Sequence, residues 1–429
     1  MLLLAVFGTL FLLLLLRVPI FAALGGATIV GVLLHPSASL IDVVRNSING
    51  IDSLVLFAAP LFVLAGNLIL AGGVSRRLIG WVDLLFGFSR LRLAYVNVFG
   101  SMFFGGISGS ATADSAAIGS VLVPEMKKGG YPTPYAAGVT AASSSIGIIV
   151  PPSVPMILAG AATSVSITKL FVGGYGPGIL IAVSLATVAW IRRPRSGVKA
   201  DPEKFSIKRM GITTYKALPA LVFPVVIMGG ILAGVFTATE AAAVAVVYSL
   251  LVAIFIYREM GWQTFFNILK ESAEFAAVLF IIVATAQAFG RFLTLAKVPQ
   301  QLTEFMLGFS STPAVVILMM ILLLLIIGTF METVPIVLVL YPILEPIATS
   351  PEVGMDPIHY GVTFMGAIAV GLLTPPYGVL LFVNSKIAGI PSADLIRAVL
   401  PFIAVLIVDV LIIAFFPPLT LGPVNFFFG

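Results

Sequence analysis

The sequence predicts an all-α polytopic membrane protein, built from two copies of one unit that face opposite sides of the bilayer. Three observations predict this fold class: the composition, a series of long apolar runs, and a weak internal repeat. Of the 429 residues, 60% are apolar or aromatic and only 10% are charged, whereas a soluble domain carries about 25% charged residues. So few charges cannot cover a water-exposed surface, and most of this surface must therefore face lipid.

The composition also excludes several kinds of chemistry. The chain has two histidines, His35 and His359, and no cysteine, so a transition-metal site, a cysteine nucleophile and a disulfide framework are not expected. Paired aspartates, a His-Glu-x-x-His motif and a Walker motif are all lacking, which argues against an intramembrane enzyme and against ATP binding. The net charge of +5 comes from short loops between apolar runs, and it gives no reason to expect nucleic acid as a partner. No cofactor is expected.

The apolar runs give the membrane crossings. A helix needs about 20 apolar residues to cross a hydrocarbon core roughly 30 Å thick. The stretch 217–257 is about twice that length with Glu240 as its only charge, so we expect one turn near Gly234. Two further runs are interrupted by polar residues at their centres, and we interpret them as re-entrant hairpins. The ten expected crossings are 2–16 (short), 18–34, 52–72, 134–165, 170–191, 217–234, 238–257, 272–289, 359–389 and 398–417.

Short matches recur in the same order 218 to 224 residues apart, which indicates a duplication. Examples are Phe57-Ala-Ala-Pro-Leu-Phe with Phe275-Ala-Ala-Val-Leu-Phe, and Pro151-Pro152 with Pro375-Pro376. Each copy then contains about five crossings and one hairpin. The expected organisation is a first repeat over 1–200 with its hairpin at 94–126, a cytoplasmic linker over 201–216, and a second repeat over 217–429 with its hairpin at 313–344.

The basic residues predict the orientation. The segment 192–209 holds seven Lys and Arg residues and is therefore expected in the cytoplasm. Residues 73–93 carry four arginines, whereas the equivalent loop 290–312 carries only Arg291 and Lys297. Equivalent loops thus look cytoplasmic in one copy and external in the other. This pattern predicts an inverted repeat with both termini outside the cell. Residues 74–92 have apolar positions at helical spacing between arginines, which predicts an amphipathic helix in the cytoplasmic interface.

Four polar segments at membrane depth carry the candidate chemistry: 105–114, 143–153, 328–335 and 371–378. They form two pairs across the repeat. In two of them a Pro-Pro pair removes two backbone donors and frees the preceding carbonyl groups. Hydroxyl and carbonyl oxygens are the ligands that a small alkali cation requires, so two cation sites are expected. Prolines and small residues also occur at ordinary kinks and helix contacts, which is the alternative interpretation.

The candidate residues follow from these segments. The first cation site comprises Ser108, Gly109, Ser110, Thr112, Ser145 and Gly147, and the second comprises Gly328, Thr329, Thr333, Gly371 and Thr374. The candidates for contacting a substrate are Ser144, Ser153, Asp114, Glu332 and Arg291. Asp114 and Glu332 each have two readings: each could adjust a cation site, and each could equally cap a helix. Arg291 is alternatively an interfacial anchor, and Glu240 is expected to cap a helix after the turn.

Four motifs resemble signatures of the large membrane subunit of TRAP (tripartite ATP-independent periplasmic) transporters. They are Gly105-Gly-Ile-Ser-Gly-Ser-Ala-Thr-Ala-Asp, Ile149-Val-Pro-Pro-Ser, Gly234-Val-Phe-Thr-Ala-Thr-Glu-Ala-Ala and Gly371-Leu-Leu-Thr-Pro-Pro-Tyr-Gly. The resemblance covers nearly the whole chain. One departure is Met331-Glu332-Thr333, where the family pattern leads us to expect an aspartate at the centre.

The resemblance implies a sodium-coupled importer of an organic acid, of the sialic acid or C4-dicarboxylate type, in a bacterial or archaeal cytoplasmic membrane. It further implies elevator-type movement of a transport domain against a scaffold domain, a small membrane subunit, and a periplasmic substrate-binding protein. Two alternatives remain open at this point. One is a stand-alone sodium–carboxylate symporter of the same architecture, and the other is a channel. The residues do not identify the organic acid.

Overall fold

The computed structural model describes residues 1–194, 198, 207–309 and 312–429, and these residues form helices and connecting turns without strands. The first half contains α1 (Leu2–Leu15), α2 (Ile20–Leu34), α3 (Leu40–Ile51), α4 (Ala58–Ala71), α5 (Val74–Phe86), α6 (Arg92–Ser108), α7 (Ala111–Lys128), α8 (Thr133–Ser144), α9 (Val154–Thr163) and α10 (Ile167–Ile191). The second half contains α11 (Ile207–Leu232), α12 (Ala238–Leu251), α13 (Trp262–Leu295), α14 (Val298–Phe309), α15 (Pro313–Gly328), α16 (Thr333–Ala348), α17 (Pro357–Gly371), α18 (Val379–Ala388), α19 (Ser392–Phe415) and α20 (Pro418–Phe428).

Six described helices are long and apolar enough to cross a membrane, and each coincides with an expected crossing. The two runs nearest the N-terminus form the shorter apolar helices α1 and α2. The runs 134–165 and 359–389 are each divided into two helices at the Pro-Pro pair, because proline cannot continue the backbone ladder. The six long segments are Leu54–Ala71, Ile167–Ile191, Lys208–Leu232, Ala238–Ile256, Trp262–Leu295 and Ser392–Phe415.

The structure has the expected turn near Gly234, but it places part of the expected linker within a helix. The turn lies between α11 and α12, where Gly234 has φ +69° and Thr237 and Glu240 form a reciprocal capping box. Glu240 therefore has the capping role that the sequence indicated. Of the expected linker, 201–206 lie outside the described residues. The remaining part, 207–216, already belongs to α11, so this helix begins before the crossing expected at 217.

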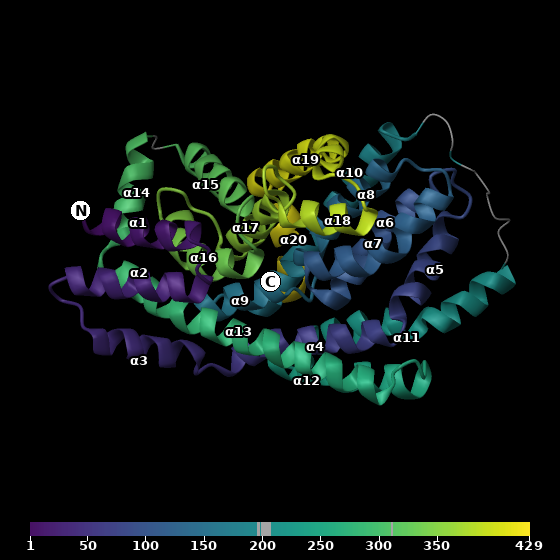
Figure 1. Cartoon of the computed structure of the whole chain (residues 1–429), viewed down its shortest axis with the longest axis horizontal. Helices are drawn as coiled ribbons and strands as arrows, with labels where there is room; N and C mark the ends of the chain where they lie inside the picture. The colour runs from purple at the N-terminus through teal and green to yellow at the C-terminus, as the bar shows by residue number, and fades with distance from the viewer. Residues whose placement is uncertain (195–197, 199–206, 310–311) are drawn as a thin grey trace.

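The helices pack as two groups (Figure 1). The framework group comprises α1–α4 and α11–α13, which contact one another along one side of the molecule. The hairpin group comprises α6–α10 and α15–α20, which form the other side. Helix α5 joins α4 to α6, and α14 joins α13 to α15. Each half therefore connects the two groups through one short amphipathic helix, and α5 lies where the sequence predicted such a helix.

The same order of elements occurs in both halves. After α4 and α5 come the helix pair α6–α7, the divided helix α8–α9 and the long helix α10. After α13 and α14 come the helix pair α15–α16, the divided helix α17–α18 and the long helix α19. The two helix pairs correspond to the runs 94–126 and 313–344 that the sequence marked as hairpins.

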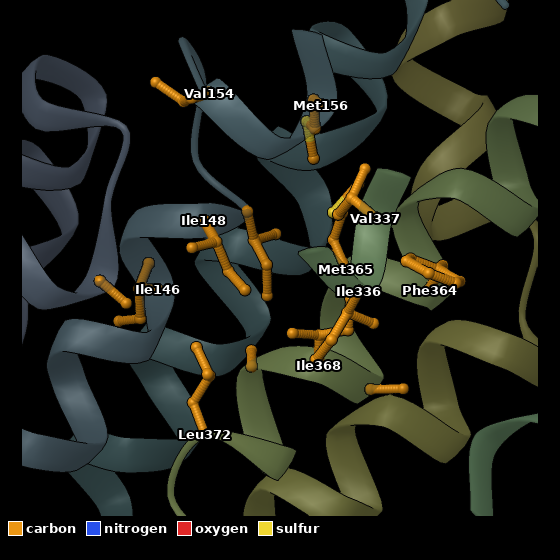
Figure 2. Packing of buried hydrophobic residues seen from close by; sticks show 14 of the residues in the cluster. Ile146, Ile148, Val154, Met156, Ile336, Val337, Phe364, Met365, Ile368 and Leu372 are labelled. Carbon is orange, nitrogen blue, oxygen red and sulfur yellow. The ribbon is translucent and has the colours of Figure 1, made fainter. Parts of the chain in front are cut away.

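The buried core joins the two halves. Figure 2 shows side chains from the first divided helix packed beside side chains from α16 and α17. Because residues from both halves fill the same space, neither divided helix has an independent core. The residues labelled in this core are Ile146, Ile148, Val154, Met156, Ile336, Val337, Phe364, Met365, Ile368 and Leu372.

A charged cluster fixes the start of α5 to the framework. Arg76 Nη2 and Arg77 Nη2 each lie 2.7 Å from one oxygen of the Glu259 carboxylate. Arg77 also donates to the carbonyl oxygen of Gly73 at 2.9 Å, and its guanidinium carbon lies 3.8 Å from the centre of the Tyr257 ring. The hydrogen bond from Arg77, with the positive charge of both arginines, lowers the pKa of Glu259. The connection between α4 and α5 is therefore held to the loop between α12 and α13.

We expect Glu259→Gln to lower the melting temperature of the purified protein by about one degree at pH 7, because it removes two charge-assisted contacts worth about 1 kcal/mol at a partly exposed site. The folded pKa of Glu259 is lower than its ordinary value of 4.5, so the carboxylate stabilises the fold above that value. The difference between wild type and variant should persist down to about pH 5 and shrink as the pH falls further.

The matched control is Glu274→Gln. Glu274 is largely exposed, and its ion-pair partner Lys270 is 3.9 Å away. This variant should therefore have the same melting temperature as the wild type. Equal effects of the two substitutions would show that the cluster does not stabilise this junction.

Candidate functional site

The first helix pair turns at a tip rich in hydroxyl groups. Helix α6 ends at Ser108, Gly109 has φ +61°, and Ser110 caps α7 by accepting from Ala113 N. The Ser108 hydroxyl donates to Asp114 Oδ1 and lies 3.3 Å from the Ser110 carbonyl oxygen. Asp114 is fully buried, and its Oδ2 has no hydrogen-bond partner among the residues that the structure describes. A hydroxyl, a carbonyl and a carboxylate thus gather behind this tip.

The first divided helix meets this tip through its backbone. Helix α8 ends at Ser144, one 3₁₀ turn follows over Ser145–Ile148, and α9 begins at Val154 after Pro151–Pro152. Val154 N donates to the Gly109 carbonyl oxygen at 3.3 Å. Gly105 and Gly147 touch, because a Cβ on Gly105 would lie only 2.8 Å from the Gly147 Cα.

The second helix pair and the second divided helix make the same two contacts. Gly378 N, just after Pro375–Pro376, donates to the Thr329 carbonyl oxygen at 3.0 Å. Gly328 packs against Gly371, where a Cβ on Gly371 would lie 2.7 Å from the Gly328 Cα. Both close approaches require residues without a side chain, since any larger residue would separate tip and break.

One cavity of about 220 Å³ lies between the tips and the framework. The N-terminal ends of α7, α9 and α16 all reach it, and unpaired N–H groups at such ends attract anions. Helix α4 and Phe275 of α13 form the framework wall. Among the described residues that line the cavity, Glu332 is the one with a formal charge. The lining residues are Val63, Gly66, Asn67, Leu70, Ser108, Gly109, Ser110, Ala111, Thr112, Ala113, Ile148, Val154, Pro155, Phe275, Glu332, Thr333, Val334 and Leu372.

The structure brings together most residues that the sequence assigned to the first cation site. Ser108, Gly109, Ser110 and Thr112 line the cavity. Gly147 lies directly behind them, where a Cβ would collide with Asp114 Oδ2. The Ser145 hydroxyl is buried and donates to the Ala142 carbonyl oxygen at 2.7 Å.

The residues assigned to the second cation site are more spread out. Gly328, Thr329 and Gly371 lie at the contact between the second tip and its break. The Thr374 hydroxyl donates to the Val370 carbonyl oxygen at 2.8 Å, close to this contact. Thr333 lines the cavity, with 7% of its surface exposed.

The residues assigned to substrate are not brought together. Only Glu332 lines the cavity. The buried hydroxyls of Ser144 and Ser153 donate to backbone carbonyl groups, those of Thr140 and Ile148, and Ser153 also caps α9. Arg291 lines a separate pocket between α2, α3 and α13.

The two acidic residues near the tips do not cap helices. Ser110 caps α7, so Asp114 is free to bond Ser108 and belongs with the oxygens of the first tip. Glu332 occupies the N-cap position of α16 but makes no side-chain capping bond. Its carboxylate is therefore available to the cavity.

Sequence reasoning missed the framework wall and a buried polar network. Asn67 lines the cavity and donates to Ser272 Oγ at 3.4 Å. Asn97 donates to Thr140 Oγ1 at 2.7 Å and accepts from Ser143 Oγ at 3.0 Å, all at zero exposure. A lone Asn within each apolar run was the available signal. Phe275 begins one of the repeat matches, although that match gave no indication of a cavity.

Fold and site together define a multi-pass membrane transporter permease. The family described as "Tripartite ATP-independent periplasmic transporter, DctM component" matches residues 7–419. The chain therefore belongs to this family of large TRAP permease subunits, as its motifs indicated, and its relatives are transporter subunits rather than enzymes.

Three relatives and one solved structure illustrate the similarity. The chain is 38% identical to the C4-dicarboxylate TRAP transporter large permease protein DctM of Pseudomonas aeruginosa, covering 86% of each chain. It is 36% identical to the sialic acid TRAP transporter large permease protein SiaM of Vibrio cholerae, covering 90% of each. It is also 36% identical to the isethionate TRAP transporter permease protein DctMQ of Oleidesulfovibrio alaskensis, covering 96% of this chain and 64% of that one. The crystal structure of the Alcanivorax borkumensis YdaH transporter shares the fold, with a TM-score of 0.61 at 17% identity over 96% of this chain and 98% of that one.

We expect Gly371→Ala to separate the second tip from its break, because the new Cβ would overlap the Gly328 backbone. Overpacking of this kind costs about 1–3 kcal/mol. The melting temperature should fall by several degrees, and uptake should be lost or strongly reduced.

Gly290→Ala is the control, because nothing lies within 4 Å of a Cβ at this helical position. Alanine there should be neutral or slightly stabilising. If Gly371→Ala behaved like Gly290→Ala, the glycine contact would not be tight in the functioning protein.

Proposed function

We propose that the chain is the large membrane subunit of a sodium-coupled importer of an organic acid. The observation that carries this proposal is the cavity between the two tips and the framework group. Two helix-pair tips enclose it, and each tip is joined by its backbone to a Pro-Pro break. Such tips and broken helices expose polar backbone at membrane depth, where it serves ligands rather than lipid.

Sodium is the coupling ion in this proposal, with two ions bound. At the first tip, the hydroxyls of Ser108 and Ser110 and the Ser110 carbonyl supply hard oxygen atoms within one small region. Asp114 Oδ2, which has no hydrogen-bond partner among the described residues, adds a carboxylate oxygen. The second site uses Thr329, Thr374 and the backbone near Gly371, where the contact between tip and break is repeated.

The substrate class is an organic anion. Three helix N-termini converge on the cavity, and no lysine or arginine is among its described lining residues, so backbone N–H groups and hydroxyls would receive the acid group. Relatives are named for C4-dicarboxylates, sialic acid and isethionate, all of which carry an acid group. We take the acid group as the shared requirement.

Transport proceeds by movement of the hairpin group against the framework group, as in an elevator. The cavity lies at the boundary between these groups, so such movement would carry it across the membrane. The repeated order of elements supports two copies, and the distribution of basic residues supports opposite orientations. In this arrangement the segment 192–209 is cytoplasmic and both termini are periplasmic.

A small membrane subunit and a periplasmic substrate-binding protein are the proposed partners. The name of the isethionate relative joins M and Q, and this chain covers only 64% of its length. The remaining length supports the expectation of a second membrane component. A stand-alone sodium–carboxylate symporter is the alternative, and dependence on partners distinguishes the two.

We expect Ser110→Ala and Thr374→Ala each to raise the sodium concentration for half-maximal uptake. Each removes one hydroxyl oxygen, and losing one ligand to a cation costs about 1.5–3 kcal/mol, or roughly 10- to 150-fold in affinity. The measurement is sodium-dependent uptake into proteoliposomes, with melting temperature followed in parallel because Ser110 also caps α7.

Two variants control for the loss of a hydroxyl alone. The Thr363 hydroxyl donates to the carbonyl oxygen four residues earlier at 2.8 Å, as the Thr374 hydroxyl does. Ser120 lies farther along α7, and its hydroxyl donates to the Ala117 carbonyl oxygen. Thr363→Ala and Ser120→Ala should keep the wild-type sodium dependence. If Ser110→Ala and Thr374→Ala kept the sodium dependence of the wild type, the first tip and the second break would be structural features and not cation sites.

We expect the purified chain alone to transport little in proteoliposomes, and uptake to appear when the small subunit and the binding protein are added. The reason is that the cavity must receive its substrate from a partner that captures it outside. Full sodium-driven uptake by this chain alone would establish the stand-alone symporter instead.

A further inference from the structure

A second polar pocket lies at one end of the framework group, apart from the central cavity. It has a volume of about 250 Å³ and is formed by α2, α3 and α13, which lie together in Figure 1. The two hollows share no lining residue. The lining residues are Thr28, Val32, Ser37, Ala38, Asp42, Val43, Asn46, Ala288, Arg291, Phe292 and Leu295.

Three polar side chains of this pocket have no partner within the described part of the chain. Asp42 and Arg291 carry opposite charges, yet no salt bridge within 4.0 Å joins them. The Asn46 side chain, one helical turn after Asp42, likewise makes no hydrogen bond to a described residue. A carboxylate, an amide and a guanidinium that face one pocket without pairing suit a ligand that carries both charges.

The faces of α3 place this pocket at the level of lipid headgroups. Ile41, Val44 and Ile48 share one face and are 69%, 61% and 58% exposed. Arg45 and Asn49 are exposed on a second face. A helix with one apolar and one charged exposed face lies in the membrane interface, with lipid on one side and water on the other.

The third face of α3 holds it against the protein. A Cβ on Gly50 would lie 2.6 Å from Gln287 Cβ of α13, so the two helices are in close contact there. Asp42 and Asn46 lie between this packed face and the water-facing one. The pocket is therefore open near the interface and closed toward the protein.

An apolar path leads from the pocket into the membrane. Ile29 and Leu33 lie one turn apart on α2 and are 44% and 67% exposed. Val32, which lies between them on α2, is buried and lines the pocket. A ligand in the pocket can thus extend hydrocarbon along α2.

We propose that this pocket binds the headgroup of a zwitterionic phospholipid that has a phosphate and a primary ammonium. Arg291 and the Asn46 amide donate to the phosphate, Asp42 accepts from the ammonium, and the acyl chains follow Ile29 and Leu33. This site is independent of the proposed transport function and gives Arg291 a ligand outside the central cavity.

The test uses the whole purified subunit after removal of lipid, with melting temperature as the readout, so that transport activity is not required. The probes are phosphatidylethanolamine, phosphatidylcholine and phosphatidylglycerol at equal concentrations. Phosphatidylethanolamine should stabilise most. The trimethylated ammonium of phosphatidylcholine cannot donate to Asp42, and phosphatidylglycerol has no ammonium. Equal stabilisation by all three lipids would overturn the proposal.

Variants locate the effect. Arg291→Gln should weaken the apparent affinity for phosphatidylethanolamine about 10-fold or more. Asp42→Asn should remove the preference for phosphatidylethanolamine over phosphatidylglycerol. Arg45→Gln is the control, because Arg45 is on the same helix but does not line the pocket, and it should leave the preference intact. An equal loss in Arg45→Gln would show that only general surface charge is involved.

Two further experiments identify the source of the ligand. Soluble O-phosphoethanolamine should stabilise far less than the lipid at the same concentration, because it lacks the acyl chains; an equal effect would overturn a lipid as the occupant. Stabilisation by an added periplasmic binding protein that depends on Arg291, with no effect of any lipid, would identify the pocket as a protein contact and would also overturn the proposal.

Discussion

The architecture depends on how the backbone is satisfied where proline pairs interrupt helices. At membrane depth no water is available, so each freed N–H and carbonyl needs a protein partner or a ligand. Each tip supplies one partner directly, through Gly109 to Val154 and through Thr329 to Gly378. The helix pairs are thereby tied to the divided helices by backbone hydrogen bonds.

The sequence predicted the fold well because its signals are local. Apolar length gives the crossings, and proline gives the positions of the breaks. The capping box at Thr237 and Glu240 marks the start of α12 in the same way. Helix boundaries were less certain where polar residues belong to helices, as at the start of α11. The length of an apolar run marks only the part of a helix inside the hydrocarbon core, not the part that extends beyond it.

The site was predictable only in part because a cavity depends on tertiary packing. Hydroxyl-rich tips were visible in the sequence, and the structure brings Ser108, Ser110 and Thr112 to one cavity. Ser144 and Ser153 have the same residue type at similar places, yet their hydroxyls bond backbone carbonyl groups. The framework wall carries no polar motif, so Asn67 could not be distinguished from a residue at an ordinary helix contact. Arg291 illustrates a further difficulty, since a charge near a membrane boundary does not show which pocket it faces.

The paired glycines have a consequence for sequence variation. For Gly328 and Gly371, a side chain on either glycine would occupy the space between the same two backbones. Once one glycine has been replaced and the tip has moved away, replacing the other requires little additional displacement. The effects of the two substitutions are then not additive, because they remove the same contact. Gly328 and Gly371 therefore act as one unit of constraint rather than two, and drift at one of them relaxes selection on the other. Gly105 and Gly147 are not coupled in this way, because a Cβ on Gly147 would meet the Asp114 carboxylate instead of Gly105.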